Sequence, residues 1–480
     1  MTNEELKQGG AYPSECTTVI VGKHMTDDGS MIVARSEDWN MSFAKNLEIY
    51  EDREEGPKEF VAQDSGFRCE LPREALGYTA LAPCHLRGSW GSAGFNTAGV
   101  GMSATESIFS SEKALAVDPL VKDGLAENSV FNIVLPYVRT AREGVSRLGS
   151  LIEKYGISEG FGIGFVDESE IWYLETASGH RWLACRMPED MYFVTGNQSR
   201  FRTYDPNDKA NYMATADLIE FAQQHGLYDP TAGPFDFHTA YIRDVKLDTT
   251  YNYPRVWGLQ AMFSPEIEND VTRNTFPVFA KADHPLSLDD MRRAFRFHYQ
   301  GTEHDPYLHN NPKEKYRPVS IFRTTQTHIL QVRPELPQAI GRVDYMAMGM
   351  AVLGVFLPLY QGITSYPEAY TKGGLRSDAD SAYWKFRKVQ TLGMVNYNRY
   401  APLIQETYAR WESETTQRQR EMEAQYLSVY KTQPIHAQEL LQAFSDKMLQ
   451  SALDVTDRLI EELFTRLAED IQAEYRFAGA

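Results

Sequence analysis

Between residues 161 and 194 the chain carries four short apolar segments that are separated by turn residues. They read FGIGFVD, IWYLETA, RWLACRM and MYFVT, and each is rich in β-branched or aromatic residues. Short strands joined by tight turns are typical of an antiparallel sheet, because such strands need no long crossover connection. This region therefore predicts an antiparallel meander and argues against a parallel βαβ array.

Two hairpins are predicted ahead of the meander. Residues 16–21 and 31–34 are apolar runs on either side of the turn signal at residues 26–30, and residues 92–105 form a second candidate. Helical periodicity is found at residues 130–155, 212–225, 400–430 and 437–476. Strands followed by long helices, with no internal repeat, predict an α+β fold.

The first hairpin brings together residues that can form a reactive thiol. Counting outward from the centre of its turn sets Cys16 opposite about residue 39, within two or three residues. Arg35 and Asp38 are then expected beside Cys16 at the open end of the hairpin. A guanidinium favours the thiolate, and a carboxylate can orient an amine or a guanidinium. The alternative is a buried structural cysteine next to a salt bridge, which is the commoner role of a free cysteine.

The net charge of −18 and the cysteine pattern narrow the classes of function. A nucleic-acid binder needs a basic face, which this acidic chain does not suggest. The four cysteines form no CxxC or Cys/His cluster, which predicts free thiols in a reducing compartment and no zinc site. Residues 1–15 are polar and lack the apolar core of a secretory signal. No later segment is long and apolar enough to span a bilayer, so we expect a cytoplasmic enzyme with no membrane partner.

Further motifs extend from the first hairpin along most of the chain. ECTTVIVG, DDGS and VARSEDWN are followed by AGFNTAGVGMSATES, WYLETASGHRW, YFVTGNQSRF, YNYPRVWGLQ, THILQVR and FLPLYQGI. In this order and approximate spacing they resemble the dipeptidase A family of N-terminal-nucleophile cysteine hydrolases. They are similar, more distantly, to choloylglycine hydrolases and penicillin V acylases. Each motif is weak alone, and the ordered set is what makes the resemblance specific.

The resemblance implies a cysteine nucleophile that becomes the first residue of the mature enzyme. In that family the residues ahead of the cysteine are removed, so residues 1–15 are expected to be a leader and Cys16 the new N-terminus. A free α-amine has a pKa of about 8 and can act as the base for the thiol of the same residue. The expected enzyme is a cysteine dipeptidase that hydrolyses small peptides through a thioester, with no metal and no cofactor.

Four further site residues follow from the matched motifs. Arg35 and Asp38 correspond to the residues that flank the nucleophile, Asn197 to the oxyanion asparagine and Arg255 to an arginine that lines the pocket. From the sequence alone, a turn residue after a strand is the more common role for an asparagine such as Asn197. The alternative for Arg255 is an ordinary surface or core-edge arginine.

The same resemblance implies the architecture. Its members are expected to form a four-layer αββα sandwich, in which two stacked antiparallel sheets are covered by helices on both outer faces. We expect one catalytic domain over residues 16–380, and a helical C-terminal extension over residues 381–480 that packs on it.

The sequence departs from the acylase relatives at one position. These relatives carry a further asparagine about ten residues after the one that corresponds to Asn96, and here that register falls near Thr105 and Glu106. The absence favours a dipeptidase over a bile-salt or penicillin hydrolase. Glu106 is a candidate to bind the α-ammonium group of a dipeptide substrate.

Three alternatives remain open at this point. The substrate could be an N-acyl amino acid or a conjugated bile acid instead of a dipeptide. A metallopeptidase is disfavoured because the chain has no HExxH motif and no ligand cluster. The third is a non-catalytic binding or assembly protein on the same fold. The sequence also leaves open whether copies of the chain form a homo-oligomer.

Overall fold

The computed structural model describes residues 15–308 and 315–475. The expected leader falls outside this range except for Glu15, with which the first strand begins. Strands β1 (Glu15–Val21) and β2 (Met31–Asp38) form the predicted hairpin. Its register pairs Cys16 with Glu37, two positions from the residue that counting along the sequence suggested and within the uncertainty of that count.

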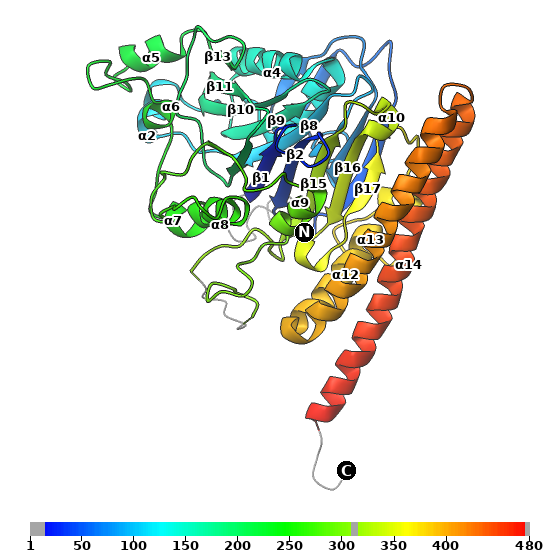
Figure 1. Ribbon diagram of the computed structural model, residues 1–480. Coiled ribbons are helices and arrows are strands. Elements are labelled where there is room, and N and C mark those ends of the chain that lie inside the picture. Colours follow the sequence, from blue (N-terminus) through cyan, green and yellow to red (C-terminus); the bar gives the residue numbers. More distant parts are fainter. Residues whose placement is uncertain (1–14, 309–314, 476–480) are drawn as a thin grey trace.

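This hairpin lies at the centre of a seven-stranded antiparallel sheet with the order β14-β12-β1-β2-β15-β16-β17 (Figure 1). The other strands are β12 (Tyr192–Thr195), β14 (Phe279–Ala280), β15 (Thr324–Val332), β16 (Arg342–Met348) and β17 (Leu357–Tyr360). The pair is flanked by β12, which pairs with Thr18–Val21 of β1, and by β15, which pairs along β2, so its position in the sheet is well defined.

A second antiparallel sheet has six strands in the order β13-β11-β10-β9-β8-β7. They are β7 (Ala93–Phe95), β8 (Gly101–Ser107), β9 (Phe161–Val166), β10 (Ile171–Ser178), β11 (Arg181–Arg186) and β13 (Tyr212–Ala214). The hairpin at residues 92–105 and the first three meander strands are thus confirmed. The fourth meander segment, β12, instead crosses to the first sheet and pairs with β1.

The two sheets pack face to face, because side chains of both meet in one apolar cluster. Ile20 and Val33 of the first sheet lie there with Val166 and Tyr173 of the second. The other face of each sheet carries helices. Val19 and Ile32 contact the cluster around helices α8 (Tyr253–Phe263) and α9 (Leu288–Phe295). The second sheet packs in the same way against α3 (Glu127–Val134) and α4 (Ala141–Tyr155).

Two expected helices differ from the structure. The helix predicted over residues 130–155 is two helices, α3 and α4, with a short 3₁₀ turn at Leu135–Tyr137 that contains Pro136. A proline inside a helix removes a hydrogen bond and clashes with the preceding turn, which explains the break. The region 212–225 begins as edge strand β13 and becomes helical only in α5 (Leu218–Gln224).

Smaller elements complete the chain. Two two-stranded sheets pair β3 with β6 and β4 with β5. Their bounds, and those of the remaining short elements, are β3 (Lys45–Tyr50), β4 (Glu59–Val61), β5 (Arg68–Glu70), β6 (Tyr78–Pro83), α2 (Glu112–Val117), α6 (Phe237–Tyr241), α7 (Asp248–Tyr251), α10 (Gln338–Gly341), a 3₁₀ turn at Ala351–Leu353 and α11 (Glu368–Thr371).

The C-terminal region is helical, as its periodicity predicts. Helices α12 (Ala382–Val395), α13 (Tyr397–Val429) and α14 (Pro434–Glu474) lie together beside β16 and β17 (Figure 1). Trp384, Tyr408 and Leu449 share an apolar cluster with Met346 and Leu357 of those strands. Among the described residues, no helix combines the length and the hydrophobicity that are needed to cross a bilayer.

Candidate active site

Cys16 lies at the open end of the central hairpin, and its side chain faces the second sheet. Side chains alternate along a strand, so Cys16, Thr18 and Ile20 point between the sheets while Thr17 and Val19 point toward α8. Arg35 shares the inter-sheet face, and its Nη1 lies 2.8 Å from the Cys16 Sγ. The same guanidinium donates to the backbone oxygens of Ala104 and Thr105 on β8. The expected pairing of Arg35 with the sulfur is thus present.

The Cys16 thiol is fully buried in the chain with its Glu15–Cys16 peptide bond intact. Burial raises its pKa well above the usual value, and the charge of Arg35 opposes that shift. Glu106 and Glu127 raise it further. The cationic neighbour is therefore the main feature that favours a thiolate here.

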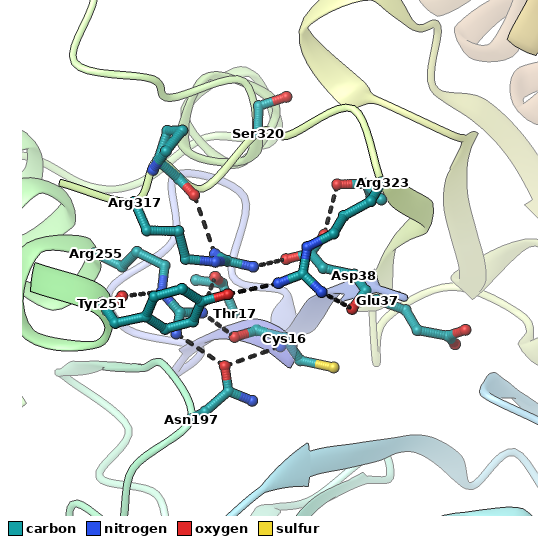
Figure 2. A network of polar contacts seen from close by, with 12 residues as sticks. Cys16, Thr17, Glu37, Asp38, Asn197, Tyr251, Arg255, Arg317, Ser320 and Arg323 are labelled. Atoms are coloured by element: carbon teal, nitrogen blue, oxygen red, sulfur yellow. Dashed lines mark hydrogen bonds and ion pairs between the residues drawn. The ribbon is translucent and has the colours of Figure 1, made fainter. Parts of the chain in front are cut away.

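Asn197 lies beside the backbone of Cys16. Thr195 of β12 pairs with Thr18 of β1, so two further residues along the chain bring Asn197 level with Cys16. The Cys16 backbone N–H donates to Asn197 Oδ1 at 3.2 Å (Figure 2). The Nδ2 group of Asn197 is buried and finds no acceptor among the described residues. A buried amide with a free donor can stabilise negative charge that develops close to it.

Arg255 of α8 holds Asn197 and the start of β1 together. Its Nη2 donates to Asn197 Oδ1 at 2.8 Å and to Asn252 Oδ1 at 2.6 Å, and its Nη1 donates to the Cys16 carbonyl and to Thr17 Oγ1. The guanidinium packs against Gly196, where an added Cβ would lie 2.9 Å from its Cζ. Arg255 is therefore a buried clamp and not a surface residue.

The loop that carries Asn197 is fixed from the second sheet. Glu175 of β10 is fully buried and accepts hydrogen bonds from Ser199 Oγ and from the backbone N–H groups of Arg200 and Phe201. Burial raises the pKa of Glu175 to about 7, although these hydrogen bonds lower it. One carboxyl thus ties together three consecutive residues directly after the Asn197 turn.

Asp38 lies at the open end of the hairpin, but its side chain does not share the face of the sulfur. It pairs with Glu15 across the strands, and strand alternation directs it to the face opposite Arg35. There it accepts from Arg317 (Figure 2). It also accepts from Thr324 Oγ1 at 2.5 Å. The sequence predicted Asp38 beside Cys16 but did not distinguish the two faces of the sheet. It gave no indication of Arg317.

Glu106 of β8 is fully buried between the sheets, on the same side as Cys16 and Thr18. Its Oε2 accepts from Thr18 Oγ1 at 2.7 Å, and its Oε1 has no hydrogen-bond partner among the described residues. Burial raises the pKa of Glu106 to about 8, against the opposing charges of Arg255 and Arg35. The Glu106 carboxyl thus has one oxygen available for a further donor.

Two buried charged residues near Cys16 were not singled out from the sequence. Glu37 is the cross-strand partner of Cys16, and Lys45 of β3 lies 2.5 Å from its Oε1. The hairpin register could have indicated Glu37, since it lies two positions from the residue expected opposite Cys16. Lys45 comes from another sheet, and no sequence pattern pointed to it. Over the described ranges, no group of three or more His, Cys, Asp or Glu side chains is arranged to hold a metal ion.

Comparison with known proteins identifies relatives along most of the chain. A protein named "Probable dipeptidase" from Salmonella dublin is 51% identical over 361 residues, which cover 75% of this chain and 83% of that one. "Probable dipeptidase A" from Streptococcus pyogenes serotype M1 is 36% identical over 394 residues, covering 80% and 83%. "Dipeptidase" from Bifidobacterium longum (strain NCC 2705) is 34% identical over 408 residues, covering 78% and 76%. The family described as Peptidase family C69 matches residues 15–410, so the resemblance to dipeptidase A is confirmed and the chain belongs to peptidase family C69.

Proposed function

We propose that this protein is a cysteine dipeptidase whose nucleophile, Cys16, is freed by removal of the residues ahead of it. The observation that carries the proposal is the placement of Cys16 at a strand end, with its nitrogen bound by Asn197 and its sulfur against Arg35. Relatives that are named dipeptidases support the substrate class. The burial of Cys16 in the intact chain agrees with a precursor that must be cleaved before it can act.

In the proposed reaction, the α-amine of Cys16 acts as the base and its thiol as the nucleophile. The liberated α-amine takes the proton of the Cys16 thiol, and the sulfur attacks the carbonyl carbon of the dipeptide. Asn197 Nδ2, which has no acceptor among the described residues, donates to the resulting oxyanion, together with a backbone N–H. The tetrahedral adduct collapses to a thioester as the C–N bond breaks, and the leaving amine takes a proton from the α-ammonium group. Water then attacks the thioester and releases the acid and the free thiol.

The flanking residues have separate roles in this proposal. Arg35 favours the thiolate, and Asn197 Oδ1 orients the amine through the contact that it already makes with the Cys16 nitrogen. Asp38 would hold the α-amine only indirectly, through the open end of the hairpin where it binds Arg317 and Thr324, and Arg255 fixes the shape of the pocket. Two hydrogen bonds from Arg255 to Cys16 and Asn197 support that last role.

We propose that Glu106 binds the α-ammonium group of the dipeptide. Its Oε1 has no partner among the described residues, and its carboxyl lies on the inter-sheet face that also carries the sulfur. An approaching ammonium group would favour the ionised carboxylate and lower its pKa from about 8. An N-acylated substrate brings no such charge, so this residue favours dipeptides over N-acyl amino acids and conjugated bile acids.

The finer architecture belongs to the same proposal. We propose the four-layer αββα sandwich of N-terminal-nucleophile hydrolases, supported by two facing sheets with helices on their outer faces. Residues 16–380 would form the catalytic domain and residues 381–480 a helical extension packed on it. A cytoplasmic location is supported by four cysteines without a disulfide.

Intact mass spectrometry and a substrate panel test the proposal. The purified protein should contain a species that begins at Cys16 and hydrolyses dipeptides. Cys16→Ala should remove dipeptide hydrolysis, whereas Cys84→Ser, which changes a half-buried free thiol elsewhere, should retain it. An active protein that keeps the Glu15–Cys16 peptide bond, or full activity of Cys16→Ala, would overturn the proposal. Faster turnover of N-acyl amino acids than of dipeptides would favour the amidohydrolase alternative, and inactivity on every substrate would favour a binding protein.

A further inference from the structure

Behind the Arg35–Cys16 contact lies a buried chain of alternating charges. Lys45 Nζ lies 2.5 Å from Glu37 Oε1, Glu37 Oε2 lies 3.4 Å from Arg35 Nη2, and Arg35 Nη1 lies 2.8 Å from Cys16 Sγ. These four side chains are each at most 5% exposed. Lys45 comes from β3 of a separate two-stranded sheet, so the contact depends on the tertiary fold.

Glu37 is held in place by three polar side chains, one just before β7 and two on β15. Ser92 Oγ donates to its Oε2 at 2.6 Å, Thr325 Oγ1 to its Oε1 at 2.9 Å, and Gln326 Nε2 to its Oε2 at 3.3 Å. Burial alone would raise the pKa of Glu37, but Lys45 and Arg35 outweigh it and hold the pKa at about 2. Glu37 therefore carries a full negative charge at neutral pH.

The charges along this chain do not balance unless the thiol ionises. Lys45 and Arg35 supply two positive charges and Glu37 supplies one negative charge. A Cys16 thiolate, as the fourth member of this set of side chains, makes the sum of their charges zero. Burial lowers the pKa of Lys45, and the adjacent Glu37 only partly opposes that shift. In a low-dielectric interior, an uncompensated charge is strongly unfavourable, so a balanced set favours the thiolate.

The other titratable groups around Arg35 contribute little opposing charge at neutral pH. Glu106 on β8 and Glu127 on α3 have pKa values raised to about 8 by burial. His328 on β15 pairs with Arg35 across the strands, and burial lowers its pKa well below the usual value. Asp38 faces the other side of the sheet, where Arg317 binds it, and Arg255 donates to backbone and amide oxygens next to Cys16.

We propose that the buried Lys45–Glu37 ion pair sets the ionisation of the Cys16 thiol by determining how much of the Arg35 charge is available to the sulfur. Lys45 engages the Glu37 carboxylate and so prevents it from neutralising Arg35. Lys45 and Glu37 are positioning residues, because they act on the sulfur only through Arg35. This inference rests on the proposed role of Cys16 as the nucleophile.

Replacement of Lys45 and replacement of Glu37 should change the reactivity of the Cys16 thiol in opposite directions. Lys45→Met leaves Glu37 to neutralise Arg35, so alkylation of Cys16 by iodoacetamide at pH 7 should slow about tenfold. Glu37→Gln leaves two cations and should speed the alkylation. The double variant restores the original net charge and should react within about threefold of the unaltered protein. The rate is measured across pH by mass spectrometry of the peptide that contains Cys16.

A variant at a distant ion pair serves as the control for these rates. Lys385→Met removes an ion pair to Asp457 between α12 and α14, and it should leave the alkylation rate unchanged. Rates that fall in both single variants, or a double variant no faster than Lys45→Met, would indicate structural damage and overturn the inference. If Lys45→Met does not fold, Glu37→Gln and the double variant still have to differ as stated. A Cys16 that is never alkylated in the purified protein would overturn the proposed function and this inference together, whereas a reactive Cys16 unaffected by these changes overturns only the inference.

Discussion

The side-chain oxygen of Asn197 accepts a hydrogen bond from the backbone nitrogen of Cys16 at 3.2 Å. The two residues are 181 positions apart in the sequence, and β12 brings them together because it pairs with β1. In the proposed enzyme this nitrogen becomes the α-amine, so one amide group would contact the base through its oxygen and the oxyanion through its nitrogen.

Replacement of Asn197 should affect turnover much more than substrate binding. Asn197→Ala removes the proposed oxyanion donor, which is expected to lower kcat about 100-fold, with a smaller change in KM. Asn211→Ala, on an exposed turn, is the control and should leave both parameters unchanged. Steady-state kinetics on a dipeptide provide the measurement, and a change confined to KM would contradict the oxyanion role.

A methyl group at position 196 should disturb the site through Arg255. The Cβ of Gly196→Ala would lie 2.9 Å from both Cζ and Nη2 of Arg255, and that guanidinium is held by four buried partners. We expect about a tenfold loss of kcat and about 1 kcal/mol lower free energy of unfolding. Gly374→Ala is the matched control, because within the part of the chain that the structure describes nothing beyond its immediate neighbours lies within 4 Å of the added Cβ. If kcat and the free energy of unfolding are the same in both variants, Arg255 adjusts to the added methyl group without loss of activity or stability.

Glu106→Gln should separate substrates by the charge of their amino end. If Glu106 binds the α-ammonium group, the variant should raise KM for dipeptides about tenfold while N-acylated substrates change little. The glutamine keeps the size of the side chain and can still hydrogen-bond Thr18. Equal losses on both substrate types would argue that the Glu106 contact is structural, and a competition assay with both substrates gives the ratio directly.

The buried carboxyls should make the protein less stable as the pH rises. Glu106 and Glu175 have pKa values of about 8 and about 7 in the folded protein, against 4.5 for an ordinary glutamate. Between these values the folded state retains protons that the unfolded chain has lost, so the free energy of unfolding falls with rising pH. Over the range from pH 4.5 to pH 8, Glu106 should contribute about 4 kcal/mol and Glu175 about 3 kcal/mol to that fall.

Urea unfolding at a series of pH values measures this dependence. Glu175→Gln should flatten the fall, because glutamine has no proton to release. Glu421→Gln, at an exposed position on α13, is the control and should leave the slope unchanged. A slope that is the same in Glu175→Gln as in the unaltered protein would show that Glu175 is ionised in the folded state.

Local patterns predicted those parts of the fold that depend on neighbours in the sequence. The turn at residues 26–30 and its apolar flanks predicted the β1–β2 hairpin, and therefore the contact between Cys16 and Arg35. Long runs of helical periodicity predicted α13 and α14. These elements form through hydrogen bonds and side-chain contacts a few residues apart, which a single sequence records directly.

Long-range contacts decided the rest of the site. The meander pattern could not show that β12 leaves the second sheet, because the pairing energy of a strand depends on which neighbour it meets. A hairpin count that was uncertain by two or three residues could not assign Asp38 to the face of Cys16 or to the opposite face, since each one-residue shift reverses the side chain. The sequence by itself determined the β1–β2 hairpin and the helical C-terminal region. Only the tertiary structure joined Lys45 to Glu37 and Arg317 to Asp38, because burying these charges is favourable only where distant segments supply their partners.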